Sequence, residues 1–235
     1  MSINSKTVLA KGSIVKETIL DPSLPSSTLL TKAETLEIAL KQRERDGGLL
    51  LNKVSRKNCN AGTRDATKYE EVCKEIIETT LQSSFKNHVV SFHSKTLEIN
   101  GYKQFVRDIT FPNNPIDLDK NCIWNILKRE FGVRSFVLEC KNYLKSKITR
   151  DEVYQLYEYL DPNEHGRLGI FLTRLGERSL DDSARSAIVR LKKDSYKLIV
   201  LKDDDMVEWI NSYITHGGPE HFFNKFIDEK RGWPI

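Results

Sequence analysis

Glu139 and Lys141 are the first residues whose types and spacing suggest chemistry. A short apolar run predicts a buried strand over residues 134–140, and the pair lies at the end of that run. Because side chains alternate along a strand, residues two apart point to the same face. The pair is then either an ion pair at the edge of the core or part of a site. In a site, the carboxylate holds a metal ion and the ammonium acts on a water molecule or a phosphate.

Asp108 is a second acid in an unusual place, because it lies between Val106 and Ile109 in a predicted strand over residues 102–111. A carboxylate among apolar neighbours is costly unless it is paired or bound to a cation. If this strand pairs with residues 134–140, Asp108 and Glu139 converge. Two carboxylates favour Mg²⁺ or Mn²⁺. Together with a lysine, such a metal provides the parts that phosphodiester hydrolysis needs.

Periodicity predicts the elements that must position these side chains, in a mixed α/β order. The expected architecture is a central sheet, part parallel and part antiparallel, with helices on both faces. Gly47 and Gly48 are expected to end the first helix, and Asp119 to cap the third. The predicted helices span residues 31–45, 67–81, 120–130, 150–160, 181–194, 204–213 and 220–229, and the strands span 88–92, 102–111, 134–140, 167–173 and 196–201.

The composition is that of a globular protein: 235 residues, 39% apolar, 30% charged and a net charge of +4. The longest apolar runs are far shorter than the roughly 20 residues of a membrane span. No stretch near the N-terminus resembles a signal peptide, so we expect a cytoplasmic protein with reduced cysteines. Residues 41–68 are basic and favour contact with phosphates or a solvated connector. We expect residues 1–60 to form an appendage and residues 61–235 to form one domain.

Glu139-Cys140-Lys141-Asn142-Tyr143 is similar to the ExKNY variant of the PD-(D/E)XK signature, and Asp108 takes the place of the upstream acid. On the next helix, Gln155 and Tyr159 resemble the QxxxY element of the same superfamily. The chain therefore resembles the restriction-endonuclease-like PD-(D/E)XK nucleases over roughly residues 67–173. The match departs from the pattern at Arg107, where the family often has proline.

The resemblance implies a restriction-endonuclease-like core and a Mg²⁺ or Mn²⁺ cofactor. It also implies that an acid of the first core helix contributes to the site. Glu70 flanks the apolar side of helix 67–81, whereas Glu71 points about 100° further round, so Glu70 is the first choice. The implied metal ligands are Asp108, Glu139, Glu70 and the carbonyl of Cys140. Lys141 is expected to assist the attacking water, and Gln155 and Tyr159 to orient Lys141 or the substrate.

The function expected from this resemblance is metal-dependent endonuclease action on DNA, of the restriction or defence type. A homodimer or a larger assembly with other subunits is a further expectation. Alternatives remain open for the site residues, for the function and for the substrate. Asp117 or Asp119 could replace Asp108, and Glu71 could replace Glu70. The fold could serve as a catalytically silent module that binds nucleic acid or protein. Finally, the substrate could be RNA.

Overall fold

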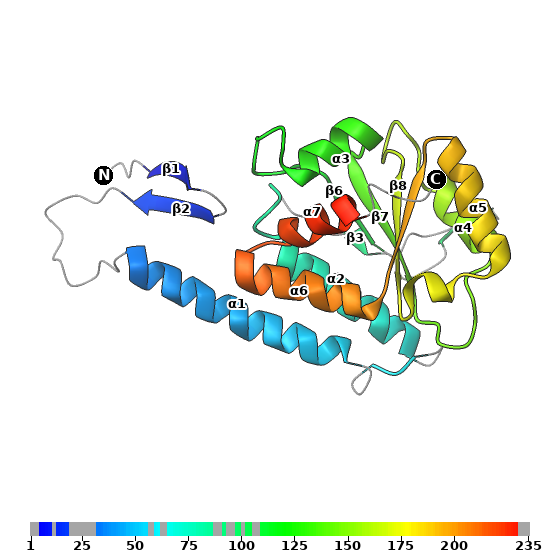
Figure 1. Cartoon of the computed structure of the whole chain (residues 1–235), viewed down its shortest axis with the longest axis horizontal. Coiled ribbons are helices and arrows are strands. Elements are labelled where there is room, and N and C mark those ends of the chain that lie inside the picture. Colours follow the sequence, from blue (N-terminus) through cyan, green and yellow to red (C-terminus); the bar gives the residue numbers. More distant parts are fainter. Residues whose placement is uncertain are drawn as a thin grey trace, which may run out of the picture.

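The computed structural model describes residues 5–10, 13–18, 32–55, 59–61, 65–86, 91–92, 97–99, 102–104 and 109–229. Within these ranges a central sheet lies among helices (Figure 1). The helices are α1 (Lys32–Val54), α2 (Ala66–Leu81), α3 (Ile123–Phe131), α4 (Arg150–Glu158), the 3₁₀ helix η3 (Gly176–Ser179), α5 (Asp182–Lys193), α6 (Asp203–His216) and α7 (Glu220–Glu229). The strands are β1 (Ser5–Ala10), β2 (Ser13–Thr18), β3 (Ser91–Phe92), β4 (Leu97–Ile99), β5 (Tyr102–Gln104), β6 (Ile109–Pro112), β7 (Ser135–Lys141), β8 (Leu168–Thr173) and β9 (Lys197–Leu201).

The central sheet has the strand order β3-β6-β7-β8-β9. Strand β6 pairs antiparallel with both β3 and β7, with Ile109 opposite Leu138. Strand β8 pairs parallel with both β7 and β9. Helices α4 and α5 connect the parallel strands, as a parallel connection requires. The predicted α/β architecture with a mixed sheet between helices is therefore confirmed. Two hairpins, β1–β2 and β4–β5, lie outside this sheet.

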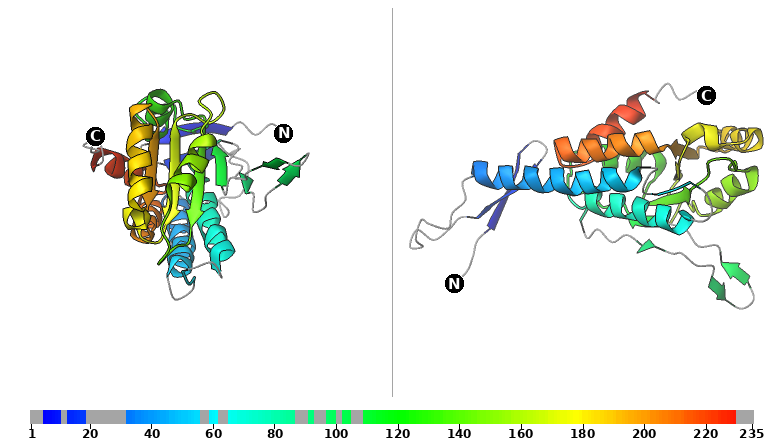
Figure 2. Two further views of the ribbon diagram at one scale, coloured as in Figure 1. Left: turned by 90° about the vertical axis from the view of Figure 1, so that its right-hand side faces the viewer. Right: turned by 90° about the horizontal axis from the view of Figure 1, so that it is seen from below.

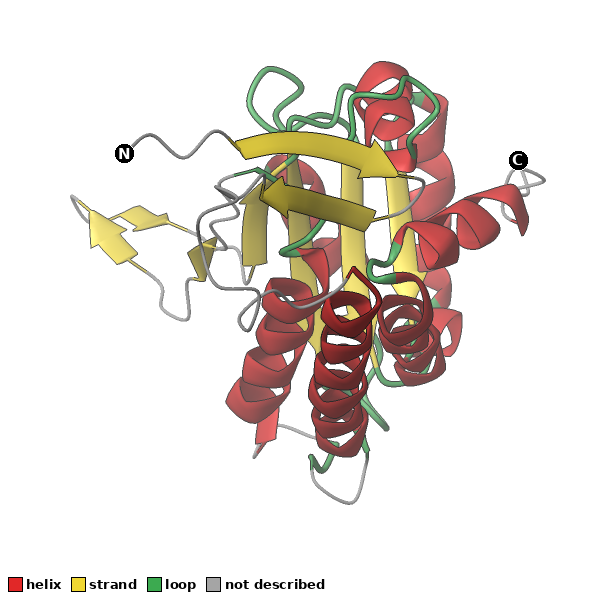
Figure 3. Ribbon diagram, turned by 90° about the vertical axis from the view of Figure 1, so that its left-hand side faces the viewer, coloured by secondary structure: helices red, strands yellow, loops and turns green. Residues whose placement is uncertain are grey.

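The hydrophobic core is divided between the two faces of the sheet. On one face α1, α2 and α6 form a row of long helices (Figure 3), and α3 and α7 add the buried rings of Trp124, Phe222 and Phe223. On the other face α4 and α5 pack against Val137 and Phe171 (Figure 2). Alternate residues of β7 belong to different clusters: Phe136, Leu138 and Cys140 to the first and Val137 to the second. The strand that carries the candidate site is thus held from both sides.

The predicted end of the first helix at Gly47-Gly48 is wrong, because α1 continues to Val54. The reason is tertiary packing. A Cβ atom at Gly47 would collide with the side chain of Ile214 on α6, so the glycine permits a close approach of the two helices. Past it, Leu50 and Val54 of α1 are buried in the core. The packing of α1 against α6 outweighs the low helix propensity of the two glycines, so the helix continues through them.

Two further predictions of local structure differ from the structure. The strand expected over residues 102–111 is described as two strands, β5 and β6, and residues 105–108 lie outside the described residues. Helix α3 begins later than expected, with Cys122 rather than Asp119 at its N-cap. The carboxylate of Asp119 instead accepts a hydrogen bond from the backbone N–H of Asn121.

The chain on both sides of residue 60 packs onto the first core cluster. Leu50, Val54 and Cys59 precede the expected boundary, and Tyr69 and Val72 follow it. The division into residues 1–60 and 61–235 stays a prediction about folding units. In the part of the chain that the structure describes, no helix is long and apolar enough to cross a membrane.

Candidate active site

Strand β7 delivers Glu139 and Lys141 to one face of the sheet and Cys140 to the other. The side chain of Cys140 is buried in the first core cluster, so only its backbone could take part in a site. Glu139 and Lys141 share the α4-facing side with Val137, as the two-residue period requires. Beyond Leu138 the described part of β6 ends, and Glu139 pairs only with Phe171 of β8 within the described sheet. The two charged residues therefore follow the last β6–β7 pair that lies within the described residues.

Lys141 is held in a network of buried charges. Its Nζ atom lies 2.8 Å from Oε1 of Glu139 and 3.4 Å from Oε1 of Glu152 on α4. The hydroxyl of Tyr143 donates to the same Glu152 oxygen at 2.8 Å. Burial alone would lower the pKa of Lys141, but the two carboxylates outweigh it and raise the pKa above its usual value. Lys141 is therefore an ammonium ion throughout the neutral range.

The second oxygen of Glu139 has no partner among the described residues. Only 8% of the Glu139 side chain is exposed, and its Oε2 atom is buried without a hydrogen bond. Leaving a buried charged oxygen unsatisfied costs more than the loss of an ordinary hydrogen bond. A native protein tolerates such a group where a ligand or ion completes it. Glu139 thus binds Lys141 with one oxygen, and its other oxygen has no hydrogen-bond partner among the described residues.

Glu70 of α2 faces the same pair of charges. Burial raises the pKa of its carboxyl group, and the negative charge of Glu139 raises it further, while Lys141 acts in the opposite direction. Glu70 is half-buried, whereas the neighbouring Glu71 is exposed. The structure therefore brings Glu70, Glu139 and Lys141 within electrostatic reach of one another. Glu71 projects away from them.

Gln155 and Tyr159 lie on α4 and at its end, and they bond to each other. The amide of Gln155 donates to the Tyr159 hydroxyl at 3.3 Å, and Tyr159 is buried in the second core cluster. The α4 side chain that pairs with Lys141 is Glu152, about one turn before Gln155. A role of Gln155 and Tyr159 in orienting Lys141 or a substrate stays a prediction.

Sequence reasoning missed Glu152, although a signal for it was present. Thr149 and Glu152 have the spacing of a capping box, and Glu152 Oε2 accepts the backbone N–H of Thr149 at 2.9 Å. That bond fixes the N-terminus of α4 and leaves Oε1 free to face Lys141 and Tyr143. One carboxylate therefore links the start of α4 to the end of β7.

The structure describes two of the other three predicted strand acids, Asp117 and Asp119, and it places them in the loop before α3. Asp108 lies outside the described residues. Asp117 and Asp119 accept backbone N–H groups within their own loop, from Asp119 and Asn121, in the segment before α3. Across the described ranges, no three His, Cys, Asp or Glu side chains form a group that could hold a metal ion. The described carboxylates of the candidate site are those of Glu70, Glu139 and Glu152.

Comparisons of the chain with models of known protein families, with curated proteins and with solved structures returned no match. Function must therefore be argued from the geometry and electrostatics of these side chains.

Proposed function

We propose that the chain is a Mg²⁺-dependent nuclease of the restriction-endonuclease-like type that cleaves DNA. The observation that carries this proposal is the buried Oε2 of Glu139, which has no hydrogen-bond partner among the described residues, beside the partly buried ammonium of Lys141. A purely structural ion pair would use both carboxylate oxygens or leave one in water. A hard divalent cation is the natural partner for a carboxylate oxygen that is held out of water.

The donors near Glu139 fit such a cation. Glu70 supplies a second carboxylate from α2, and burial together with the negative charge of Glu139 raises the pKa of that group. The carbonyl of Cys140 would add a neutral oxygen from the strand itself. When bound, Mg²⁺ would lower the pKa of a water molecule and polarise the phosphoryl oxygens of the substrate.

The proposal includes Asp108 as the second strand carboxylate. Its chain neighbour Ile109 lies opposite Leu138, and Leu138 precedes Glu139. Consecutive Cα atoms are 3.8 Å apart, so a continuation of this register by one residue would set Asp108 opposite Glu139. Cross-strand residues share a face, which is the convergence that the proposed metal site needs.

The charge of Lys141 restricts its role. Because its pKa is raised, the ammonium cannot accept a proton from water at neutral pH. It can donate a hydrogen bond that orients the attacking water, or stabilise negative charge as it develops on the phosphate. Glu139 and Glu152 hold the Nζ atom in place for either task. The proton of the attacking water must therefore leave to another group or to solvent.

The test is cleavage of supercoiled plasmid with Mg²⁺ or Mn²⁺ by the wild type and by Glu139→Gln and Lys141→Met variants. Both substitutions keep the approximate size of the side chain and remove its charge. We expect metal-dependent nicking by the wild type that EDTA stops and that both variants lack. A Lys225→Met variant, in an exposed ion pair with Glu208 outside the basic stretch of residues 41–68, serves as the matched control and should cleave normally. An intact plasmid, with no binding of either metal by calorimetry, would refute the proposal.

A second candidate function is a binding module without catalysis, and one observation favours it. Lys141 is already neutralised by two carboxylates, Glu139 and Glu152, as expected of an ion pair that only stabilises the fold. Binding of DNA or RNA without metal uptake would support this alternative. Cleavage of single-stranded RNA in place of plasmid would retain the mechanism and change the substrate.

A further inference from the structure

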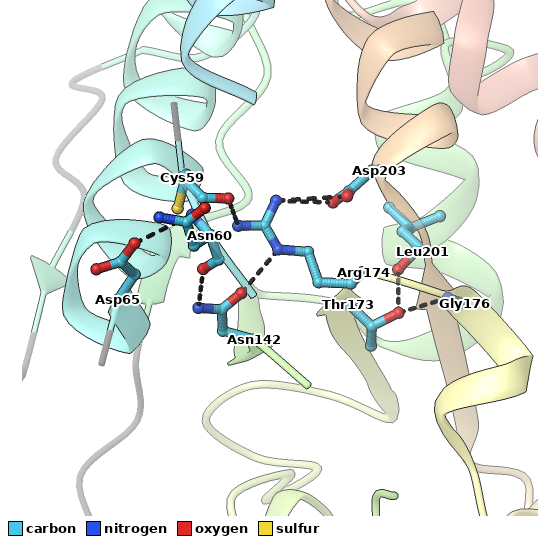
Figure 4. Close-up of polar contacts among 9 residues, drawn as sticks. All are labelled: Cys59, Asn60, Asp65, Asn142, Thr173, Arg174, Gly176, Leu201 and Asp203. Atoms are coloured by element: carbon cyan, nitrogen blue, oxygen red, sulfur yellow. Dashed lines mark hydrogen bonds and ion pairs between the residues drawn. The ribbon is translucent and has the colours of Figure 1, made fainter. Parts of the chain in front are cut away.

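Arg174 is a fully buried cation at the carboxyl end of β8, and its guanidinium binds groups from three separate segments (Figure 4). Nε donates to Oδ1 of Asn142 at 2.7 Å, and Nη2 donates to the carbonyl of Cys59 at 2.7 Å. Nη1 lies 3.4 Å from Oδ2 of Asp203. The planar group also lies over the ring of Tyr69, 4.2 Å from its centroid.

The contacts continue from Arg174 to the start of α2. Asn142 accepts from Arg174 with its oxygen and donates with its amide nitrogen to the carbonyl of Asn60 at 3.0 Å. The backbone N–H of Asn60 in turn donates to Asp65 at 3.1 Å, and Asp65 is the N-cap residue of α2. Figure 4 shows these side chains as one connected series between β8 and α2.

Two residues that contact Arg174 are chain neighbours of the candidate active site. Asn142 directly follows Lys141, and Tyr69 directly precedes Glu70. Glu70 belongs to α2, whereas Glu139 and Lys141 belong to β7. The distance between these carboxylates therefore depends on how α2 is placed against the end of β7. Among the described contacts, those that join α2 to the end of β7 include the Arg174 series and the packing of Tyr69.

We propose that Arg174 and Asn142 are positioning residues that set Glu70 against Glu139 for metal binding. The inference rests on the proposed function, since it assigns these residues a task in the same site. An arginine suits this task because its rigid fork directs hydrogen bonds in several fixed directions at once. Burial holds the fork in one arrangement, because each of its donors must find an acceptor within the protein.

Asn142 is the better residue to change, because loss of Arg174 would leave Asp203 buried without its cation and endanger folding. Asn142→Leu removes both side-chain hydrogen bonds without altering charge or size greatly. Thr173→Val is the matched control. Thr173 is also buried beside Arg174, and it also makes two hydrogen bonds, to the Leu201 carbonyl at 2.9 Å and from the Gly176 N–H at 2.7 Å. Those bonds lead to β9 and η3, away from α2.

The experiment measures Mn²⁺ binding by calorimetry in the wild type and both variants, and hydrogen exchange of the amides at residues 70–73. We expect Asn142→Leu to weaken Mn²⁺ binding by about 10- to 100-fold, the range for residues that orient metal ligands. Thr173→Val should change it by less than about twofold, because its contacts do not reach the ligands. Faster exchange in α2 should accompany the asparagine change alone.

Equal effects of the two variants on binding and exchange would overturn the inference, since both would then reflect general loss of stability. Unchanged binding in Asn142→Leu would overturn it as well, while leaving the proposed function intact. If the wild type itself binds no Mn²⁺, the proposed function fails and the assignment of Arg174 and Asn142 to a metal site fails with it. The exchange measurement would then still show whether the series fixes α2.

Discussion

Replacing Lys141 by methionine is the perturbation whose magnitude follows most directly from the structure. The side chains of Lys141 and Glu139 are only 14% and 8% exposed, with 2.8 Å between Nζ and Oε1. The variant leaves Glu139 buried with neither oxygen paired. Breaking one partner of a buried ion pair costs about 3–5 kcal/mol. For a domain of this size that corresponds to a fall in melting temperature of roughly 6–20 °C.

The loss should depend on pH in a defined direction. The pKa of Lys141 is raised in the folded chain, so its contribution is complete below the unfolded value of 10.5 and is lost only as the pH rises past it. The wild-type pair is therefore intact at both pH 7 and pH 5. Above pH 10.5, unfolding of the wild type releases the proton of Lys141, which favours the unfolded chain. The stability difference between the two proteins should therefore be smaller at about pH 11 than at pH 7.

The assay is thermal unfolding of both proteins at pH 7, with and without Mg²⁺, and at about pH 11 without it. The Lys53→Met variant provides the reference, because Lys53 and Glu75 are 45% and 43% exposed and such a pair contributes at most about 1 kcal/mol. Added Mg²⁺ should stabilise Lys141→Met more than the wild type, since the cation replaces a lost positive charge. A loss no larger than that of Lys53→Met, or independent of pH, would refute the buried network.

Four other substitutions test further features of the site and of the fold. Glu70→Gln should weaken Mg²⁺ binding and yet stabilise the metal-free protein at neutral pH, because the raised pKa of Glu70 means that its charged form is disfavoured in the folded state. Calorimetry measures the binding and thermal unfolding measures the stability. Glu71→Gln is the control and should change neither. Tyr159→Phe removes the hydroxyl that Gln155 binds, and should lower plasmid cleavage at a stability cost of about 1 kcal/mol; normal cleavage would remove Tyr159 from the site. In α1, Gly48→Ala has open space and should stabilise by about 0.5–1 kcal/mol. Gly47→Ala collides with α6 and should destabilise by about 1–3 kcal/mol. If urea unfolding shows that both glycine substitutions change the free energy of unfolding in the same direction, the described packing of α1 against α6 is contradicted.

The sheet strands and helices around the site could be predicted because each depends on a local pattern. The apolar run before Glu139 predicts β7, and the 3.6-residue period predicts α2 and α4. Asp181, just before α5, caps that helix through the N–H of Ala184. Two-residue alternation also places Glu139 and Lys141 on one face. Periodicity, side-chain alternation and helix capping all act between residues that are close in sequence, so a sequence pattern can reveal them.

The failures have long-range causes. Gly47 resembles a helix end, and only the approach of Ile214, far along the chain, shows that it is a packing contact. Arg174 resembles a surface residue after a strand, because nothing nearby in the sequence supplies its acceptors. These lie at Cys59, Asn142 and Asp203.

The end of β7 is fixed by two polar networks on different elements, and this bears on whether Lys141 is structural or functional. Glu139 and Lys141 are held by α4 through Glu152, while Asn142 is tied to Arg174 and thereby to α2. A buried ion pair is a weak source of stability, since apolar side chains of the same size often serve as well. A pair in which one oxygen has no partner among the described residues is weaker still. Apolar side chains of similar size, such as leucine and methionine, would serve a fold that needed only packing here. The low value of this ion pair for stability supports the proposed cation site beside Glu139.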